Sequence, residues 1–245
     1  MSILTIDIGT ASEHALAAVK AVVDKNERER VMPDEPAGPL RVAQALSDFF
    51  EMASAIENSE GEVDKKDMTG VADYALDLFD RVAFQLNELQ ITNQRGNISR
   101  LFAIMSVWFA RRGAELANLQ GAADGFAALT NGLEDPADLT EMCLLMEEVV
   151  EAAAPKIAAD ADRGNPWRPW RVLNLNVGVA ATRAMDARLM DRVFGNLVQL
   201  LPHDAPGFFN DGRSQMDVQE VPEAVREVLR RYAAKYPSNP ANGIL

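Results

Sequence analysis

Hydrophobic residues recur at three- and four-residue steps along most of the chain, which is the spacing of one face of an α-helix. The clearest stripe comprises Met68, Val71, Ala72, Ala75, Leu78, Phe79, Val82, Leu86 and Leu89. Asp67 lies directly before this stripe and is a favourable helix N-cap, because its carboxylate can accept backbone N–H bonds. The pattern therefore predicts a long helix that packs against a partner along its full length.

From Ile98 to Ala110, apolar residues occupy nearly every side of the predicted helix. A helix that is apolar all round is packed by several neighbours, so we expect this segment at the centre of the molecule. The helix that follows, from about 114 to 133, contains Gly121 and Gly125, which we expect to permit close approach of a neighbouring helix.

Caps and prolines divide the rest of the chain into further helices. Asp135-Pro136 and Asn165-Pro166 combine a capping side chain with a proline suited to the first turn. We expect the first helix to begin near Ala11, with Thr10 or Ser12 as its cap, and residues 3–8 to form a short strand or an ordered tail. Other helices are predicted at about 40–56, 136–154, 186–201, from Asp204 and from Pro222.

About ten helices joined by mostly short turns predict an all-α fold of antiparallel helix pairs, arranged as an α-α superhelix or an irregular helical bundle. We expect residues 1–245 to form one all-helical domain. A possible subdivision separates N-terminal helices in 1–95 from a stack of helical pairs in 96–237.

Prolines in the second half recur at intervals of 33, 33 and 35 residues, at Pro136, Pro169, Pro202 and Pro237. Between two of them, Val177-Gly178 falls in one predicted helix, Phe194 in the next, and Pro202 closes the unit. This order resembles a tetratricopeptide repeat, in which a small residue lets paired helices pack closely and an aromatic residue fills the gap.

The resemblance covers residues 98–237 in part, and residues 1–95 do not match. Met190 stands where the family usually has alanine, and Ala181 where it has tyrosine. The resemblance implies that the chain binds a peptide or protein on a concave face. It carries no particular ligand residues over, because the ligand contacts vary within the family.

A formal charge of −13 disfavours anionic partners. Nucleic-acid phosphates and anionic membranes are bound mainly through Lys and Arg. We therefore expect no nucleic-acid or membrane partner. The single cysteine, Cys143, lies in an apolar run and is interpreted as a buried hydrophobic residue. The first ten residues lack the basic start and apolar core of a signal peptide, so we expect a cytoplasmic protein.

Catalytic and metal-binding patterns were sought and none was found. His14 and His203 have no second histidine or cysteine at metal-ligand spacing. His14 is expected to be exposed, and His203 to offset the negative end of a helix. Glu147, Glu148 and Glu151 are interpreted as a solvated helix face. We expect neither a cofactor, nor a metal, nor a catalytic residue.

One segment departs from the acidic trend. Six arginines and only two acids lie between Arg163 and Arg192, namely Arg163, Arg168, Arg171, Arg183, Arg188 and Arg192 with Asp186 and Asp191. The candidate binding residues are Trp167, Arg168, Trp170, Arg171 and Asn174. Under one interpretation, guanidinium groups and a tryptophan face bind a carboxylate or phosphate. Under the other, acids from the first half of the chain pair with these arginines.

Three functional hypotheses follow. The leading one is a non-enzymatic protein–protein interaction module, either an adaptor or a chaperone-like scaffold, that binds a protein or peptide. The second is an all-helical enzyme or small-anion-binding protein with a site around Trp167–Asn176. The third is a homodimer that forms through the Met- and Leu-rich helices and has a structural role.

Overall fold

The computed structural model describes residues 3–33, 38–59, 61, 63–216 and 221–237. These residues contain the helices α1 (Ile8–Glu29), α2 (Pro39–Glu57), α3 (Lys65–Glu88), α4 (Arg95–Arg111), α5 (Gln120–Asn131), α6 (Pro136–Glu151), α7 (Pro155–Ala158), α8 (Pro169–Arg183), α9 (Ala187–Leu200), α10 (Ala205–Met216) and α11 (Glu223–Lys235). No strand is present among them, and residues 3–7 lead as a tail into α1, which begins at Ile8. The all-α prediction is confirmed.

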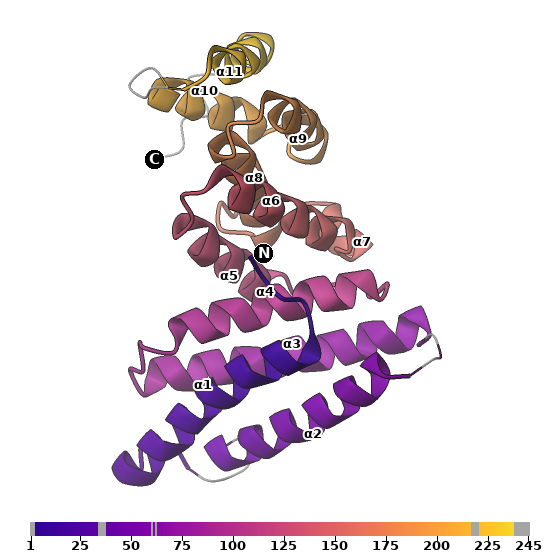
Figure 1. Cartoon of the computed structure of the whole chain (residues 1–245), viewed down its shortest axis with the longest axis vertical. Helices are drawn as coiled ribbons and strands as arrows, with labels where there is room; N and C mark the ends of the chain where they lie inside the picture. Colours follow the sequence, from indigo (N-terminus) through magenta and orange to yellow (C-terminus); the bar gives the residue numbers. More distant parts are fainter. Residues whose placement is uncertain (1–2, 34–37, 60, 62, 217–220, 238–245) are drawn as a thin grey trace.

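The helices form a broad N-terminal bundle from which a narrower column of helices rises (Figure 1). In the bundle, α1 packs against α2, α3 and α4, and α3 also contacts α2 and α4. The column continues from α4 through α5 and α6 to α8, then to α9, and ends with α10 and α11. Helix α4 thus belongs to both parts and connects them.

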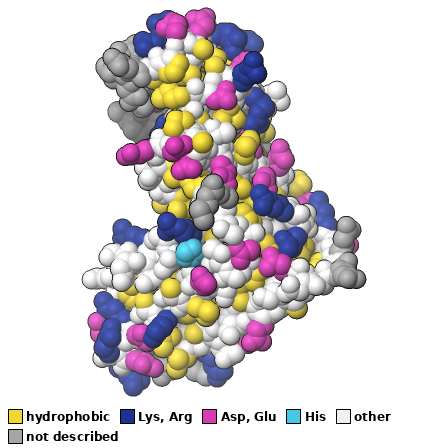
Figure 2. Space-filling model, in the orientation of Figure 1, with side chains coloured by type: hydrophobic (Ala, Val, Ile, Leu, Met, Phe, Trp, Pro, Cys, Tyr) yellow, Lys and Arg dark blue, Asp and Glu magenta, His cyan; other side chains and the backbone are white. Residues whose placement is uncertain are grey.

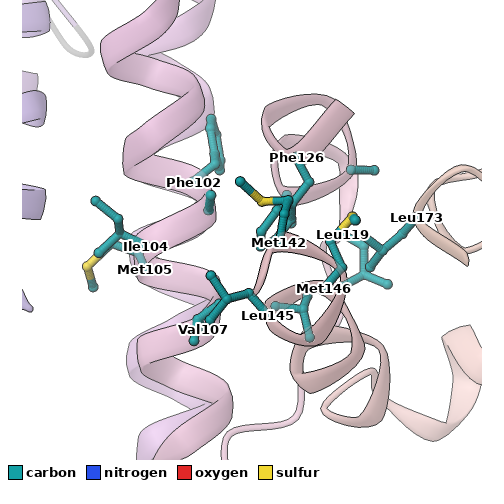
Figure 3. Close-up of a cluster of buried hydrophobic side chains, with 14 of the residues drawn as sticks. Phe102, Ile104, Met105, Val107, Leu119, Phe126, Met142, Leu145, Met146 and Leu173 are labelled. Atoms are coloured by element: carbon teal, nitrogen blue, oxygen red, sulfur yellow. The ribbon is translucent and has the colours of Figure 1, made fainter. Parts of the chain in front are cut away.

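Helix α4 is central because nearly every side of it is apolar, as the sequence predicted. The side chains from Leu101 to Phe109 are all buried. Phe102 and Val107 point toward Phe126 of α5 and the methionines of α6, whereas Ile104 points to the opposite side (Figure 3). Burial of this helix on both sides makes the bundle and the column share one hydrophobic core.

Glycine allows α5 to lie directly against α4. A Cβ atom on Gly121 would lie 2.1 Å from the Phe102 ring, and one on Gly125 would lie 2.8 Å from the carbonyl oxygen of Ser99. The expected close approach at these two glycines is confirmed. The helix itself is shorter than predicted, because Leu116 instead bonds to the backbone of residues 152 and 154 and α5 begins at Gln120.

Helix starts follow local capping in most places. Asp135 and Asp186 cap α6 and α9 through their carboxylates, as predicted. The predicted starts of the first and third helices are wrong by a few residues: Asp7 caps α1, and Asp64 caps α3. In each case an aspartate further upstream provides the capping oxygen.

The top of the column is held by aromatic rings. Phe194 of α9 contacts Phe208 and Phe209 of α10 and Tyr232 of α11, with ring centroids 4.9–5.6 Å apart. Gly178 of α8 makes room for Phe208, since a Cβ atom there would lie 2.8 Å from that ring.

The surface that Figure 2 shows carries acidic and basic side chains mixed together, with hydrophobic side chains in small groups. None of the helices in the described part of the chain combines the length and hydrophobicity that a membrane span requires.

Candidate functional site

The candidate residues predicted from the sequence lie where the chain enters α8, but they do not form one surface. Trp167 is 79% exposed in the connection before the helix, whereas Trp170 in the first turn is 4% exposed. Arg168 and Asn174 are buried as well. The structure therefore separates the exposed tryptophan from the buried members of the cluster.

Arg168 forms a buried ion-pair network with two aspartates. Its Nε and Nη2 atoms donate to the carboxylate of Asp160 at 2.5 and 3.0 Å, and Nη2 also donates to Asp204 at 2.7 Å. Its Nη1 atom donates to the carbonyl oxygen of Asn165 at 3.1 Å. The hydrogen bond to Asp160 raises the pKa of Arg168, so the side chain is a permanent cation.

Arg171 shares one of these carboxylates. Its Nε atom donates to Asp204 at 2.6 Å, and its Nη1 atom donates to the carbonyl oxygen of Pro166 at 2.9 Å. Asp160 precedes α8 and Asp204 precedes α10, so the acids come from the second half of the chain and not from the first. The network links the entry of α8 to the entry of α10.

Three other arginines of this segment also bind within the chain. Arg192 forms a two-pronged ion pair with Glu147 at 2.6 and 2.7 Å. Arg183 donates to the carbonyl oxygens of Thr130, in the last turn of α5, and of Leu133, just after the helix. Arg163 contacts the carbonyl oxygen of Asp160 and the Nε2 atom of His203. Most of these arginines thus donate hydrogen bonds to carboxylate or carbonyl oxygens of the same chain.

Asn174 is the candidate residue that contributes, although buried, to the lining of a shallow groove between α6, α8 and α9. The groove holds a hollow of about 70 Å³ and is lined by Glu147, Val150, Glu151, Asn174, Val177, Val193, Asn196, Leu197 and Leu200. Its lining contains two carboxylates and two amides around an apolar floor, and no lysine or arginine.

Of the four polar side chains of the groove, two are hydrogen-bonded to other residues of the chain. Glu147 is engaged by Arg192, and the Nδ2 atom of Asn174 donates to the carbonyl oxygen of Trp170 at 2.8 Å. The side chains of Glu151 and Asn196 are exposed and make no hydrogen bond with any described residue, although Glu147 and, to a smaller extent, the Glu151 carboxylate raise the pKa of Arg192. The groove can therefore offer one carboxylate and one amide that have no hydrogen-bond partner beside the apolar floor.

Sequence reasoning missed most of this groove. Val193 and Leu197 lie in the helix predicted at about 186–201, and Glu151 is interpreted from the sequence as part of a solvated face. Asn196 and Leu200 follow them at helical spacing on α9, which is the one signal that could have placed them with Val193. Their convergence with Asn174 depends on how three helices pack, which spacing along one helix does not specify.

Cys143 and His14 are potentially reactive side chains outside the arginine cluster. Burial raises the pKa of the Cys143 thiol to about 12, so it is not a nucleophile at neutral pH. The Nδ1 atom of His14 lies 3.0 Å from Oδ1 of Asn97, and this histidine is half-buried where we expected an exposed one. No group of three or more His, Cys, Asp or Glu side chains in the described ranges could hold a metal ion.

Comparison of the chain with protein-family models, with curated proteins and with solved structures found no match. The tetratricopeptide-like resemblance therefore stays a prediction, and the chemistry of the groove is the basis for a functional proposal.

Proposed function

We propose that the protein is a non-enzymatic interaction module that binds a basic, partly apolar peptide segment of a partner protein in the groove between α6, α8 and α9. The observation that carries this proposal is the lining of the groove: apolar side chains in its floor, carboxylates and amides around it, and no cation.

Each part of the lining suits one part of such a segment. Val177, Val193 and Leu197 can bury an apolar side chain, which is the main favourable contribution to peptide binding. The Glu151 carboxylate can pair with a lysine or arginine, and the Asn196 amide can hydrogen-bond to the peptide backbone. The charge of −13 adds a long-range attraction for a basic partner.

The test measures binding of fluorescent peptides that contain leucine with lysine or arginine, and of matched peptides in which glutamate replaces the basic residues. The groove variant is Glu151→Lys with Leu200→Asn; both positions lie at the groove surface. The control variant is Glu134→Lys with Leu16→Asn, which makes the same changes at exposed positions outside the groove.

We expect saturable binding of the basic peptides only. The groove variant should bind them roughly tenfold or more weakly, because it loses an ion pair and an apolar contact. The control variant should bind as the parent does. Equal binding by both variants, or equal binding of the glutamate peptides, would contradict the proposal.

A further inference from the structure

A second concavity, larger than the groove, lies where the N-terminal bundle meets the column. It has a volume of about 340 Å³, which is within the range of about 300–1,000 Å³ typical of small-molecule sites. It is lined by Ile3, Leu4, Arg95, Gly96, Ser99, Arg100, Ala128, Leu129, Gly132, Leu133 and Met142. The N-terminal segment, α4, α5, the turn after α5 and α6 all contribute to its walls.

The lining is apolar apart from one serine and two arginines, and it includes no acidic residue. Both arginines are exposed, and the Arg95 guanidinium makes no hydrogen bond or ion pair with any described residue. Arg100 donates only to the carbonyl oxygen of Gly96 in its own helix, at 3.4 Å. Two positive charges thus share one cavity without a carboxylate partner in the described part of the chain.

Four arginines elsewhere in the molecule are paired with carboxylates. Arg111, Arg168, Arg171 and Arg192 each form an ion pair at 2.7 Å or less. Acidic residues outnumber basic ones by 37 to 24, so carboxylates are plentiful along the chain. The pair in the cavity therefore has the charge that complements an anion, and neither guanidinium forms an ion pair with a described carboxylate.

The walls of the cavity are held in place by contacts that need no ligand. Arg183 binds the carbonyl oxygens of Thr130 and Leu133, which fixes the end of α5 and the turn after it. Leu4 and Met142 are buried, and Gly125 holds α5 close to Ser99 of α4. The concavity is thus preformed, which lowers the entropic cost of binding.

We propose that this cavity binds a small amphipathic carboxylate, with its carboxylate on Arg95 and Arg100 and its apolar body against Leu129, Leu133 and Met142. Guanidinium groups match a carboxylate through paired N–H donors, and the apolar wall removes the rest of the ligand from water. The site lies away from the peptide groove, so the inference goes beyond the proposed function and does not depend on it.

The experiment titrates octanoate and its neutral counterpart octanamide into the full-length protein by isothermal titration calorimetry, at low and at high salt. Arg95→Gln with Arg100→Gln removes both charges, and Ala128→Phe places a bulky side chain in the cavity from an exposed helix position. Arg28→Gln with Arg188→Gln is the matched control, since both arginines are exposed and have no ion pair with a described residue.

We expect saturable octanoate binding that weakens with salt, and octanamide binding at least tenfold weaker. The double arginine variant should bind octanoate roughly tenfold or more weakly, Ala128→Phe should abolish binding, and the control should bind normally. Circular dichroism checks that each variant is folded. If the double arginine variant does not fold, Ala128→Phe still tests whether octanoate binds in the cavity.

Three results would overturn the inference: no saturable octanoate binding by the parent, equal binding of octanamide, or full binding by Ala128→Phe. A fourth is tighter binding of a peptide with a free carboxyl-terminal leucine, which would assign the site to a protein terminus. The groove variant Glu151→Lys with Leu200→Asn should still bind octanoate, so failure of the peptide proposal and of this one can be told apart.

Discussion

At the scale of single residues, the feature with the largest desolvation cost is the burial of Arg168 between Asp160 and Asp204. Arg168 is 6% exposed and Asp160 is 9% exposed. Charges this far from water are tolerated because each has an oppositely charged partner and additional hydrogen bonds. The stability of the connection before α8 therefore depends on the arginine and its aspartates being present together.

Arg168→Ala should lower the free energy of unfolding by about 3–5 kcal/mol, because it leaves the buried Asp160 carboxylate without a charged partner and leaves Asp204 with Arg171 alone. Urea denaturation followed by circular dichroism measures this change. Arg188→Ala is the control, and it should change the free energy of unfolding by no more than about 0.5 kcal/mol, since Arg188 is exposed. An equally small loss for Arg168→Ala would show that water solvates the two aspartates.

The sequence indicated that these arginines need anions, but the acids in the first half of the chain that it offered as partners are not the ones that bind Arg168 and Arg171. Asp160 is eight positions from Arg168 and Asp204 is 36 positions away. Charge patterns report an imbalance within a segment, whereas the partner depends on tertiary packing. For the same reason, the sequence could nominate Asn174 as a site residue but not the other sides of its groove.

At the scale of elements, local rules predicted the helices well wherever capping and packing agreed. Asp135-Pro136 begins α6 as expected, because the Asp135 carboxylate accepts from the next free backbone amides. At Asn165-Pro166 the prediction of a helix start is wrong. Asn165 does accept from the backbone N–H of Trp167 at 2.9 Å, but the helix begins only at Pro169, after Arg168 has turned toward its aspartates. Pro169 disfavours helical backbone at Arg168 and suits the first turn itself, so the second proline sets the start of the helix.

The contact between α4 and α5 gives a prediction at this scale. Alanine normally stabilises a helix relative to glycine by about 0.5–1 kcal/mol, and Gly70→Ala should show this gain because its Cβ would meet open space. Gly121→Ala should instead destabilise the protein by about 1–3 kcal/mol, because its Cβ would collide with the buried Phe102 ring. Thermal and urea denaturation of the two variants give the comparison. Stabilisation by both would mean that α4 and α5 lie further apart than described.

At the scale of the whole molecule, α4 decides how far the two parts behave as one unit. It contacts α1 and α3 on one side and α5 and α6 on the other, whereas α10 and α11 pack mainly on each other and on α9 (Figure 1). A helical column in which each helix contacts only its neighbours can open from its end. The predicted subdivision at residue 95 is therefore a question of cooperativity, which hydrogen exchange can measure.

Two phenylalanines at opposite ends of the molecule allow that measurement. Phe49 packs on Phe50 and Phe79 in the bundle, and Phe209 packs on Phe194 and Tyr232 at the top of the column. Replacing either by alanine removes about 3–5 kcal/mol of local packing. Phe209→Ala should speed amide exchange in α9–α11 while α1–α3 keep their protection, and Phe49→Ala should do the reverse. Faster exchange along the entire chain in both variants would instead mean that α4 transmits every loss of packing, so that bundle and column unfold as a single cooperative unit.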